Sequence, residues 1–356
     1  MLFSPHIPHW VQPYLRFFPT IALIAGFIID ALTINRPDAL FENVVILGYL
    51  FLSAAAILAL QAHSPTEQNE NRRLLLLTAL QFSFGSLASA LLILYAHSGT
   101  FAGNAIFIGI LTSLLVGNEL LRSKYARMHL RVIIWFTLAL TYSTLIVPVL
   151  LNSIGTFVFI VSVLVALSVV ALLITLLSSI TRDPFSHERR NIRLSVLLIA
   201  VFFSMLYFTH LIPPVPLALK HIGIYHSIER DGNSYLATYE TPRWYEFWRS
   251  TNEVFHYTPN TPVFCFSAVF APRNLKTEIR HRWEMYDPET EKWNTMARIP
   301  FPISGGRTEG FRGYTQTTQI REGLWRCSVE TSRGSLIGRS TFRAELGSAV
   351  YVEKEL

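Results

Sequence analysis

Long apolar runs separated by short polar connections fill the first 213 residues of this 356-residue chain. A bilayer core of about 30 Å is spanned by a helix of about 20 apolar residues, and lipid excludes open backbone structures because their polar groups would stay unpaired. Seven runs are long enough, which predicts seven transmembrane helices at residues 17–34, 44–62, 74–95, 101–121, 132–151, 156–180 and 194–212.

The pattern changes to a period of two from Thr261 onward. Short runs such as PVFCFSAVF, KTEIRHRWEMYD and GLWRCSVE alternate apolar and polar positions, and turn-rich links such as DPETE and SGGRTEG separate them. Several short strands at this spacing favour an all-β, immunoglobulin-like sandwich. The chain is therefore predicted to contain a seven-helix transmembrane domain (1–213), a junction and membrane-interface segment (214–256) and an extracytoplasmic β-sandwich domain (257–356).

The junction segment begins with prolines that end the last predicted helix. A predicted β-hairpin follows, with its turn at Asp231-Gly232. Next comes PRWYEFWRS, in which Trp244 and Trp248 fall on one side of a helical turn. Tryptophan favours the membrane interface because its ring is apolar while its N–H can bond to water. We interpret this aromatic segment as an interfacial anchor, with a ligand-binding patch as the alternative.

Lysine and arginine are distributed unevenly between the two sets of predicted connections. Eleven lie on one side of the spans, from Arg16 to Arg193, whereas two, Arg36 and Lys220, lie on the other. Short cytoplasmic loops retain positive charge. The bias therefore predicts a multi-pass protein of a bacterial-type cytoplasmic membrane, with a cytoplasmic N-terminus and the β domain outside the cytoplasm.

Composition narrows the function classes. Hydrophobic residues make up 51% of the chain and charged residues 15%, against about 25% charged in ordinary soluble domains. The net charge of +6 needs no nucleic-acid partner, because the basic residues of the first half lie in topology-setting loops. Two cysteines, Cys265 and Cys327, exclude zinc sites built on CxxC pairs. No cofactor motif or cleavable signal peptide is recognisable, so the first span is expected to be an uncleaved anchor.

Ionisable side chains within a predicted span are candidate functional groups. Asp30 and His210 lie near the outer ends of the first and seventh predicted spans, where the two could meet at one depth. We favour the simpler interpretation that each reaches the headgroup region and is solvated. Small and polar residues of the third span instead favour a helix-packing face, namely Gln81, Ser83, Gly85, Ser86 and Ser89. The polar run of the fifth span, Tyr142 to Thr144, fits either role.

Cys265, Trp283 and Cys327 follow the order and approximate spacing of the Cys, Trp, Cys set of immunoglobulin domains. In that set a disulfide joins the two sheets beside a buried tryptophan, and an oxidising compartment would permit the bond. Two separate buried thiols are the alternative, because spacing along the sequence does not fix distance. His281 alternates in phase with Trp283, which favours a hydrogen-bonded core histidine over a catalyst.

Glycines, aromatics and arginines form a further pattern: His281-x-Trp283, the run Gly310 to Tyr314, Gly323-x-Trp325-Arg326, and the closing Gly334, Gly338 and Phe342. At these residues the chain resembles the bacterial domain-of-unknown-function family 2914, over about the last 100 residues. The PPVPLALK junction and the preceding spans look like the membrane-anchored members. The resemblance implies a domain boundary and no established activity, so it implies no catalytic residues.

Two functions fit these observations. The first is a membrane binding or scaffolding protein whose outer β domain contacts a protein or cell-envelope glycan. Aromatic faces stack on sugars and anchor protein interfaces, so the candidate contacts are Trp244, Trp248, Trp293 and Tyr314. The alternative is a membrane enzyme or carrier for a lipid-linked or small substrate, centred on the aspartate and histidine near the span ends. An enzyme should bring several acid, base or metal-ligand groups together. Only two such groups, Asp30 and His210, are found here, and both lie near the ends of their spans. A binding function is therefore favoured, and self-association is left open.

Overall fold

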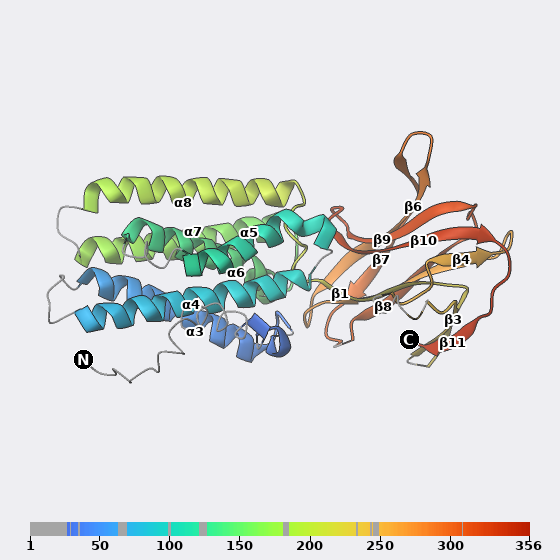
Figure 1. Cartoon of the computed structure of the whole chain (residues 1–356), viewed down its shortest axis with the longest axis horizontal. Helices are drawn as coiled ribbons and strands as arrows, with labels where there is room; N and C mark the ends of the chain where they lie inside the picture. The colour runs from blue at the N-terminus through green and yellow to red at the C-terminus, as the bar shows by residue number, and fades with distance from the viewer. Residues whose placement is uncertain are drawn as a thin grey trace, which may run out of the picture. The chain divides into compact units, whose positions relative to one another are not determined.

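The computed structural model describes residues 27–356 apart from positions 29, 35, 63–69, 99–100, 121–126, 181–184, 233, 243, 245–248 and 308. The chain divides into two compact units, which are treated separately (Figure 1). The helical unit comprises Met1–Tyr95, Ile106–Val147 and Phe159–Phe208. The β unit comprises Ala96–Ala105, Pro148–Val158 and Thr209–Leu356.

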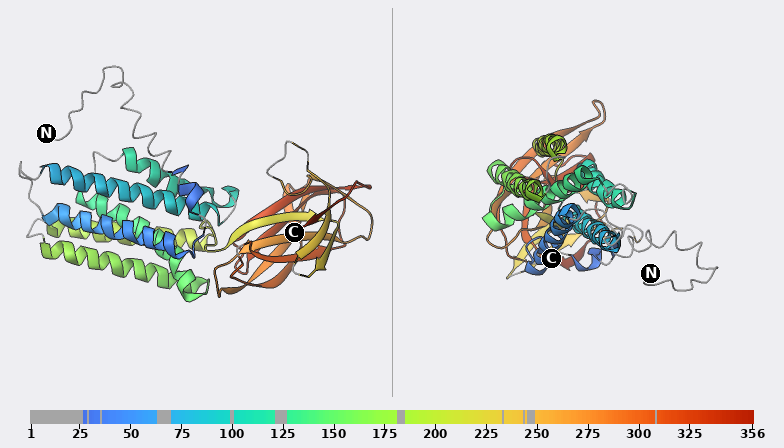
Figure 2. Two further views of the ribbon diagram at one scale, coloured as in Figure 1. Left: turned by 90° about the horizontal axis from the view of Figure 1, so that it is seen from below. Right: turned by 90° about the vertical axis from the view of Figure 1, so that its left-hand side faces the viewer.

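The helical unit is built from long apolar helices that run side by side and are seen end-on in the right-hand view of Figure 2. The labelled helices are α3 (Leu40–Ala62), α4 (Glu70–Ala96), α5 (Phe101–Leu120), α6 (Met128–Leu151), α7 (Thr156–Ile180) and α8 (Phe185–Phe208). Five stretches of the described chain are long and apolar enough to cross a membrane: Leu40–Ala62, Leu75–Ala96, Met128–Leu151, Thr156–Ile180 and Glu188–Phe208.

The predicted spans and the observed helices differ in three places. The first predicted span, 17–34, lies mostly outside the described residues, and its described part is helical at 27–28 and 30–33. In α5 the apolar stretch, Ala105–Asn118, is shorter than the other five. The seventh predicted span extends to residue 212, whereas α8 ends at Phe208. His210 has a φ of 59°, a left-handed conformation that a right-handed helix cannot contain, so it lies beyond the helix rather than inside a span.

Helix α6 occupies the centre of the helical unit, because most of its side chains are buried by its neighbours. Trp135 Nε1 donates a hydrogen bond of 3.1 Å to the carbonyl oxygen of Leu50 in α3. The hydroxyl of Tyr142 donates to Asn43 Oδ1, also in α3, at 3.0 Å. The hydroxyl of Tyr95 in α4 donates to the carbonyl oxygen of Thr141 at 2.9 Å. The polar run at mid-depth of α6 therefore contributes to contacts between helices.

Gly85 allows α4 and α5 to approach closely. A Cβ atom at this position would lie 3.0 Å from Asn118 Nδ2 of α5. The same amide donates a 3.0 Å hydrogen bond to the carbonyl oxygen of Gln81, one turn earlier in α4. A larger side chain at position 85 would displace this amide, so Gly85 has the helix-packing role that the sequence predicted for it.

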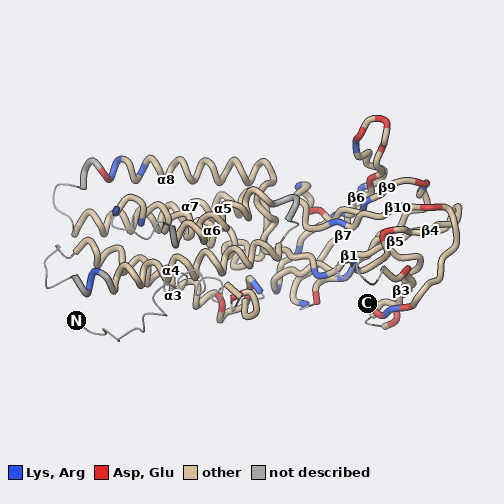
Figure 3. Tube along the Cα trace, viewed as in Figure 1, with Lys and Arg blue, Asp and Glu red and all other residues tan. Residues whose placement is uncertain are grey.

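Apart from Arg36, which precedes α3, the described arginines of the helical unit gather at the end where α4, α6 and α8 begin (Figure 3). Arg72 and Arg73 lie in the first turn of α4, and Arg131 lies in the first turn of α6. Arg189, Arg190 and Arg193 lie in the first three turns of α8. The apolar bodies of these helices carry almost no charge by comparison, which is the pattern of a protein surrounded by lipid.

The β unit contains three sheets with the strand orders β1-β5-β8, β4-β10-β9-β6-β7 and β11-β3-β2. The strands are β1 (Ala218–Tyr225), β2 (Ser227–Asp231), β3 (Ser234–Tyr239), β4 (Val254–Tyr257), β5 (Val263–Phe270), β6 (Lys276–Asp287), β7 (Lys292–Ser304), β8 (Phe311–Thr317), β9 (Gly323–Thr331), β10 (Leu336–Leu346) and β11 (Val352–Glu355).

The first two sheets enclose a common apolar core. Cys265 of the three-stranded sheet belongs to the same buried cluster as Trp283, Trp325 and Phe342 of the five-stranded sheet. In the five-stranded sheet these side chains alternate with residues of the outer face, because successive residues of a strand face opposite sides of the sheet. The period-two pattern of the sequence therefore produces a buried layer and a polar outer face on the five-stranded sheet.

The β unit begins earlier than the predicted boundary at residue 257. Strand β1 pairs along most of β5, and β4 pairs in parallel with β10. The predicted junction at 214–256 thus supplies strands to the folded unit instead of forming a separate segment. A local pattern reveals the β2–β3 hairpin but not these long-range pairings, which explains why the sequence placed the boundary too late.

Candidate functional site

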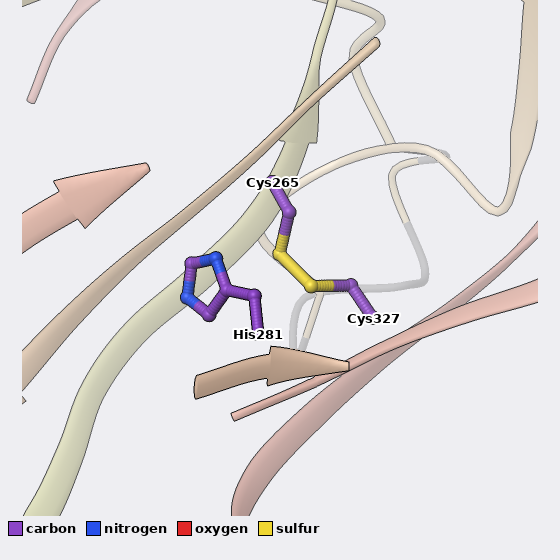
Figure 4. A group of neighbouring side chains, drawn as sticks. All are labelled: Cys265, His281 and Cys327. Carbon is purple, nitrogen blue, oxygen red and sulfur yellow. A yellow bond between two sulfur atoms is a disulfide. The ribbon is translucent and has the colours of Figure 1, made fainter. Parts of the chain in front are cut away.

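A disulfide joins the two main sheets of the β unit (Figure 4). Cys265 of β5 and Cys327 of β9 form this bond across a sequence separation of 62 residues. Both residues are fully buried, and Trp283 lies in the same cluster. The bond therefore links β5 of the three-stranded sheet to β9 of the five-stranded sheet, two strands that are far apart in the sequence.

His281 of β6 lies beside the disulfide and forms a polar network in the core. Its Nε2 is 2.8 Å from Ser267 Oγ, and its Nδ1 is 3.0 Å from Thr315 Oγ1. Trp283 Nε1 donates to the same Thr315 oxygen at 3.1 Å. Burial lowers the pKa of His281 to about 3. His281 is therefore a neutral, hydrogen-bonded core histidine, as its position in the strand pattern predicted.

The potential ligand atoms of Cys265, His281 and Cys327 lie within 4.8 Å of one another. Metal binding by cysteine requires a thiolate, but these two sulfurs are bonded to each other. Both imidazole nitrogens also have hydroxyl partners. The arrangement is therefore a structural crosslink with a polar neighbour while the disulfide is intact.

The titration of His281 gives a testable pH dependence. In the unfolded chain a histidine has a pKa of about 6.5, while the buried group keeps its low pKa of about 3. The unfolded state then binds more protons below pH 6.5, so the stability of the β unit falls as pH decreases through this window. We expect His281→Gln to flatten the fall in thermal midpoint between pH 7 and pH 4, measured by tryptophan fluorescence of the full chain. Equal slopes in both proteins would contradict this prediction.

The outer face of the five-stranded sheet carries six arginines, which we call the arginine face. They are Arg280 and Arg282 of β6, Arg298 of β7, Arg326 of β9, and Arg339 and Arg343 of β10. Arg282 lies directly opposite Arg298 on one side and Ser328 on the other. Ser328 in turn lies opposite Arg339. Three of the arginines therefore form one row across four adjacent strands.

Two buried glutamates lie among these arginines. Glu284 accepts two hydrogen bonds from Arg326, at 2.6 Å from Nε and 3.1 Å from Nη2. Arg282 Nη2 lies 2.7 Å from Glu330 Oε1. Burial raises the pKa of Glu330, and the neighbouring charge of Arg282 opposes that rise. The long arginine side chains thus cover and partly neutralise the carboxylates beneath them.

Trp293 adds an aromatic ring to this face. The guanidinium of Arg326 lies over its ring, 4.1 Å from the centre, within the range of a cation–π interaction. Tyr286 of β6 contacts the same ring, with 5.3 Å between the ring centres. Trp293, one of the predicted aromatic contacts, therefore lies among the side chains of the arginine face.

Comparison with known families covers this same part of the chain. Residues 276–344 match the family described as protein of unknown function (DUF2914). The resemblance inferred from the sequence is thereby confirmed for this DUF2914 region. It contains the strands of the arginine face, all six of its arginines, and Cys327 of the disulfide.

The structure explains the pattern of the DUF2914 region. Trp325 and Phe342 fill the core beside Trp283. A Cβ atom at Gly313 would lie 2.6 Å from the ring of Phe301, so a larger residue here would displace that ring. Gly323 has a φ of 135°, which other residues rarely adopt. These residues maintain the sandwich, whereas Arg326 belongs to its outer face.

Comparisons with individual proteins add little. The comparison with curated proteins found no match. Among solved structures, the chain is similar to the Pseudomonas fluorescens alkylpurine DNA glycosylase AlkC bound to DNA containing an abasic site analog. The sequence identity is 11%, the TM-score is 0.22, and the alignment covers 85% of this chain and 98% of that chain. A TM-score of this size carries no argument about fold or activity.

The other predicted aromatic contacts lie elsewhere. Tyr314 is in β8 of the three-stranded sheet, where its side chain is 41% exposed and contacts Tyr235 and Phe264. Trp244 is 91% exposed, whereas Trp248 lies outside the described residues. Trp293 and Tyr314 thus belong to different sheets. The membrane-anchor interpretation of Trp244 and Trp248 stays a prediction.

Asp30 and His210 are described in different units. Asp30 lies in the helical stretch 30–33 and is partly buried. His210 lies after α8, is exposed, and has its Nδ1 3.0 Å from Ser335 Oγ of the β unit. His210 is thus bonded to the loop before β10, and the favoured interpretation that both side chains are solvated near the headgroup region stays a prediction.

Sequence reasoning missed two polar clusters. Glu240 is buried and accepts hydrogen bonds from His226, at 3.0 Å, and from the ring of His256, at 2.9 Å. Burial raises the pKa of Glu240, but these hydrogen bonds outweigh it and lower the pKa overall. The arginine face was the second omission. Alternating arginines in separate strands were its signal, but strand order was needed to bring them together.

Proposed function

We propose that this chain is a multi-pass protein of a bacterial-type cytoplasmic membrane that presents an immunoglobulin-like DUF2914 domain outside the cytoplasm to a partner. The arginine face carries the proposal, because fixed charges and Trp293 are displayed on a sheet whose other side is a closed core. The membrane-like helices would then anchor this recognition surface. A protein or cell-envelope glycan is the expected class of partner.

Two features support the location outside the cytoplasm. The loops on one side of the predicted spans contain eleven arginines and lysines, and those on the other side contain two. This bias favours a cytoplasmic position for the side with eleven. Disulfides persist in oxidising compartments, in agreement with the Cys265–Cys327 bond. Both features favour an extracytoplasmic β unit, and the seven-span topology is part of the same proposal.

Reporter fusions test the orientation. Alkaline phosphatase, which is active only outside the cytoplasm, is expected to be active when fused after Leu356 and inactive when fused after His187, because these positions lie on opposite sides in the proposed topology. The measurement is enzyme activity normalised to the amount of fusion protein in the membrane. A reversed activity pattern would contradict the proposed orientation.

A site-specific crosslink tests the recognition role. Thr295 of β7 is exposed and lies opposite Glu284 on the outer face. A photoreactive residue at position 295 of the full chain is expected to capture a partner in living cells. Lys354 of β11 is exposed in a different sheet and provides a matched control position. The absence of any adduct from position 295, or equal adducts from both positions, would refute the recognition face.

A further inference from the structure

The row Arg298, Arg282, Arg339 places like charges opposite one another across the sheet. Arg282 and Arg298 are direct cross-strand partners, an arrangement that destabilises a sheet when nothing compensates it. Burial lowers the pKa of Arg339, and the charges of Arg326 and Arg282 lower it further, while Glu284 and Glu330 oppose part of this change. Repulsion between these guanidinium groups therefore lowers the stability of the sheet, and the row is not explained by a contribution to folding.

The acidic residues of this face do not balance its arginines. Glu284 and Glu330 are engaged by Arg326 and Arg282, and Glu278 contacts Arg280 at 3.5 Å. Glu345, two residues after Arg343 in β10, is exposed on the same face, so four glutamates face six arginines. The remaining three, Arg298, Arg339 and Arg343, are exposed and form no ion pair with any residue that the structure describes. Glu330 interacts electrostatically with Arg298 and Arg339, but no described carboxylate lies within ion-pair distance of these three guanidinium groups, which leaves them accessible to an external anion.

Apolar anchors are scarce on the same strands. Among their described residues, the large hydrophobic side chains exposed to solvent are Met296 and Leu346. A protein interface depends on buried aromatic or aliphatic anchors at its centre, and stable attachment to a bilayer surface also uses inserted apolar side chains. The composition of this face therefore suits a polar, charged ligand better than it suits a protein partner or a bilayer surface.

We propose that the arginine face binds an anionic glycan, a sugar chain that carries carboxylate or phosphate groups. Adjacent strands lie about 4.8 Å apart, so the row from β7 to β10 extends for about 14 Å, the length of a few sugar units. Guanidinium groups bind carboxylate and phosphate through paired hydrogen bonds, and Trp293 provides a ring against which a sugar can stack. The inference rests on the proposed recognition function and specifies its ligand class.

The test compares two charge reversals in the full chain, reconstituted in neutral-lipid nanodiscs. The first, Arg298→Glu with Arg339→Glu, removes two unpaired arginines from the row. The matched control, Arg230→Glu with Lys354→Glu, makes the same change in charge on the sheet β11-β3-β2. The probes are polygalacturonate, dextran phosphate and neutral dextran. Each arginine that contacts an anion contributes about tenfold in affinity.

We expect the unmodified protein to bind both anionic glycans but not neutral dextran, with weaker binding at higher salt. The reversal on the arginine face should weaken binding about 100-fold, and the control reversal should change it less than about threefold. Arg298→Gln with Arg339→Gln serves as a milder variant, and the thermal midpoint of the β unit verifies that each variant is folded. A smaller, intermediate loss is expected for the glutamine variant.

Three results would overturn the inference. They are equal binding of neutral dextran, tighter arginine-dependent binding of polyglutamate or of phosphatidylglycerol vesicles, and unchanged glycan binding after the reversal. The crosslink from position 295 separates these failures from that of the proposed function. A specific adduct together with unchanged glycan binding would reject the glycan and leave the recognition role standing. The absence of an adduct would reject the recognition role itself.

Discussion

Replacing Cys265 and Cys327 together by alanine is expected to lower the free energy of unfolding of the β unit by about 4 kcal/mol. The disulfide closes a loop with a sequence separation of 62 residues, and its loss returns the corresponding conformational freedom to the unfolded chain. Trp283 and Trp325 are buried in the same cluster, so their fluorescence in the full chain reports the unfolding. Reduction of the unmodified protein is expected to have a comparable effect.

The bond itself is checked by mass mapping of non-reduced peptides after thiol trapping. The expected product is a crosslinked pair of peptides containing Cys265 and Cys327. Single alanine substitutions serve as controls, because each removes the bond and leaves one thiol. Alkylation of both cysteines in protein that was denatured without reductant would show that the bond does not form in the membrane-isolated chain.

Replacing Glu284 by glutamine is expected to destabilise the β unit by about 3 kcal/mol, because a nearly buried charge pair loses one partner. The side chain of Glu284 is 4% exposed, and Arg326 binds it through two nitrogens. The substitution keeps the shape of the side chain but leaves the Arg326 guanidinium without its counter-charge. The measurement is the thermal midpoint of the full chain, monitored by tryptophan fluorescence.

Glu278→Gln provides the matched control for this prediction. Glu278 is 49% exposed, and its oxygen lies 3.5 Å from Arg280. Such an exposed pair contributes less than about 1 kcal/mol, so this variant should melt close to the unmodified protein. Equal destabilisation by both substitutions would indicate that burial of the Glu284–Arg326 pair is not the cause.

Local periodicity was sufficient to predict much of the architecture. A helix in lipid pairs all its backbone polar groups internally, so a long apolar run is sufficient to predict it. The runs at 44–62 and 156–180 correspond closely to α3 and α7. Alternation along β6 likewise separated His281 and Trp283 of the core from Arg280 and Arg282 of the outer face. In both cases the information lies in the spacing of side chains along one element.

Features that depend on contacts between residues far apart in the sequence could not be predicted from local patterns. No local signal shows that β4 pairs with β10 in parallel, or that β9 lies between β6 and β10. For this reason the arginine row remained hidden although each of its members was visible in the sequence. The end of α8 was misplaced for a similar reason: His210 continues a nearly apolar run, yet it is bonded to Ser335 more than 100 residues away.

The pairing of early strands with late ones also determines how the β unit must fold. β3 pairs with β11, and β4 pairs with β10, so two sheets stay incomplete until almost the entire unit has been synthesised. Folding that depends on such non-local contacts is slow, because loop closure precedes the stabilising contacts. The unfinished sheets would expose unpaired edges during this delay. In the proposed topology, the unit would cross the membrane as an unfolded chain and complete these sheets outside the cytoplasm, where a folding factor would protect the unpaired edges.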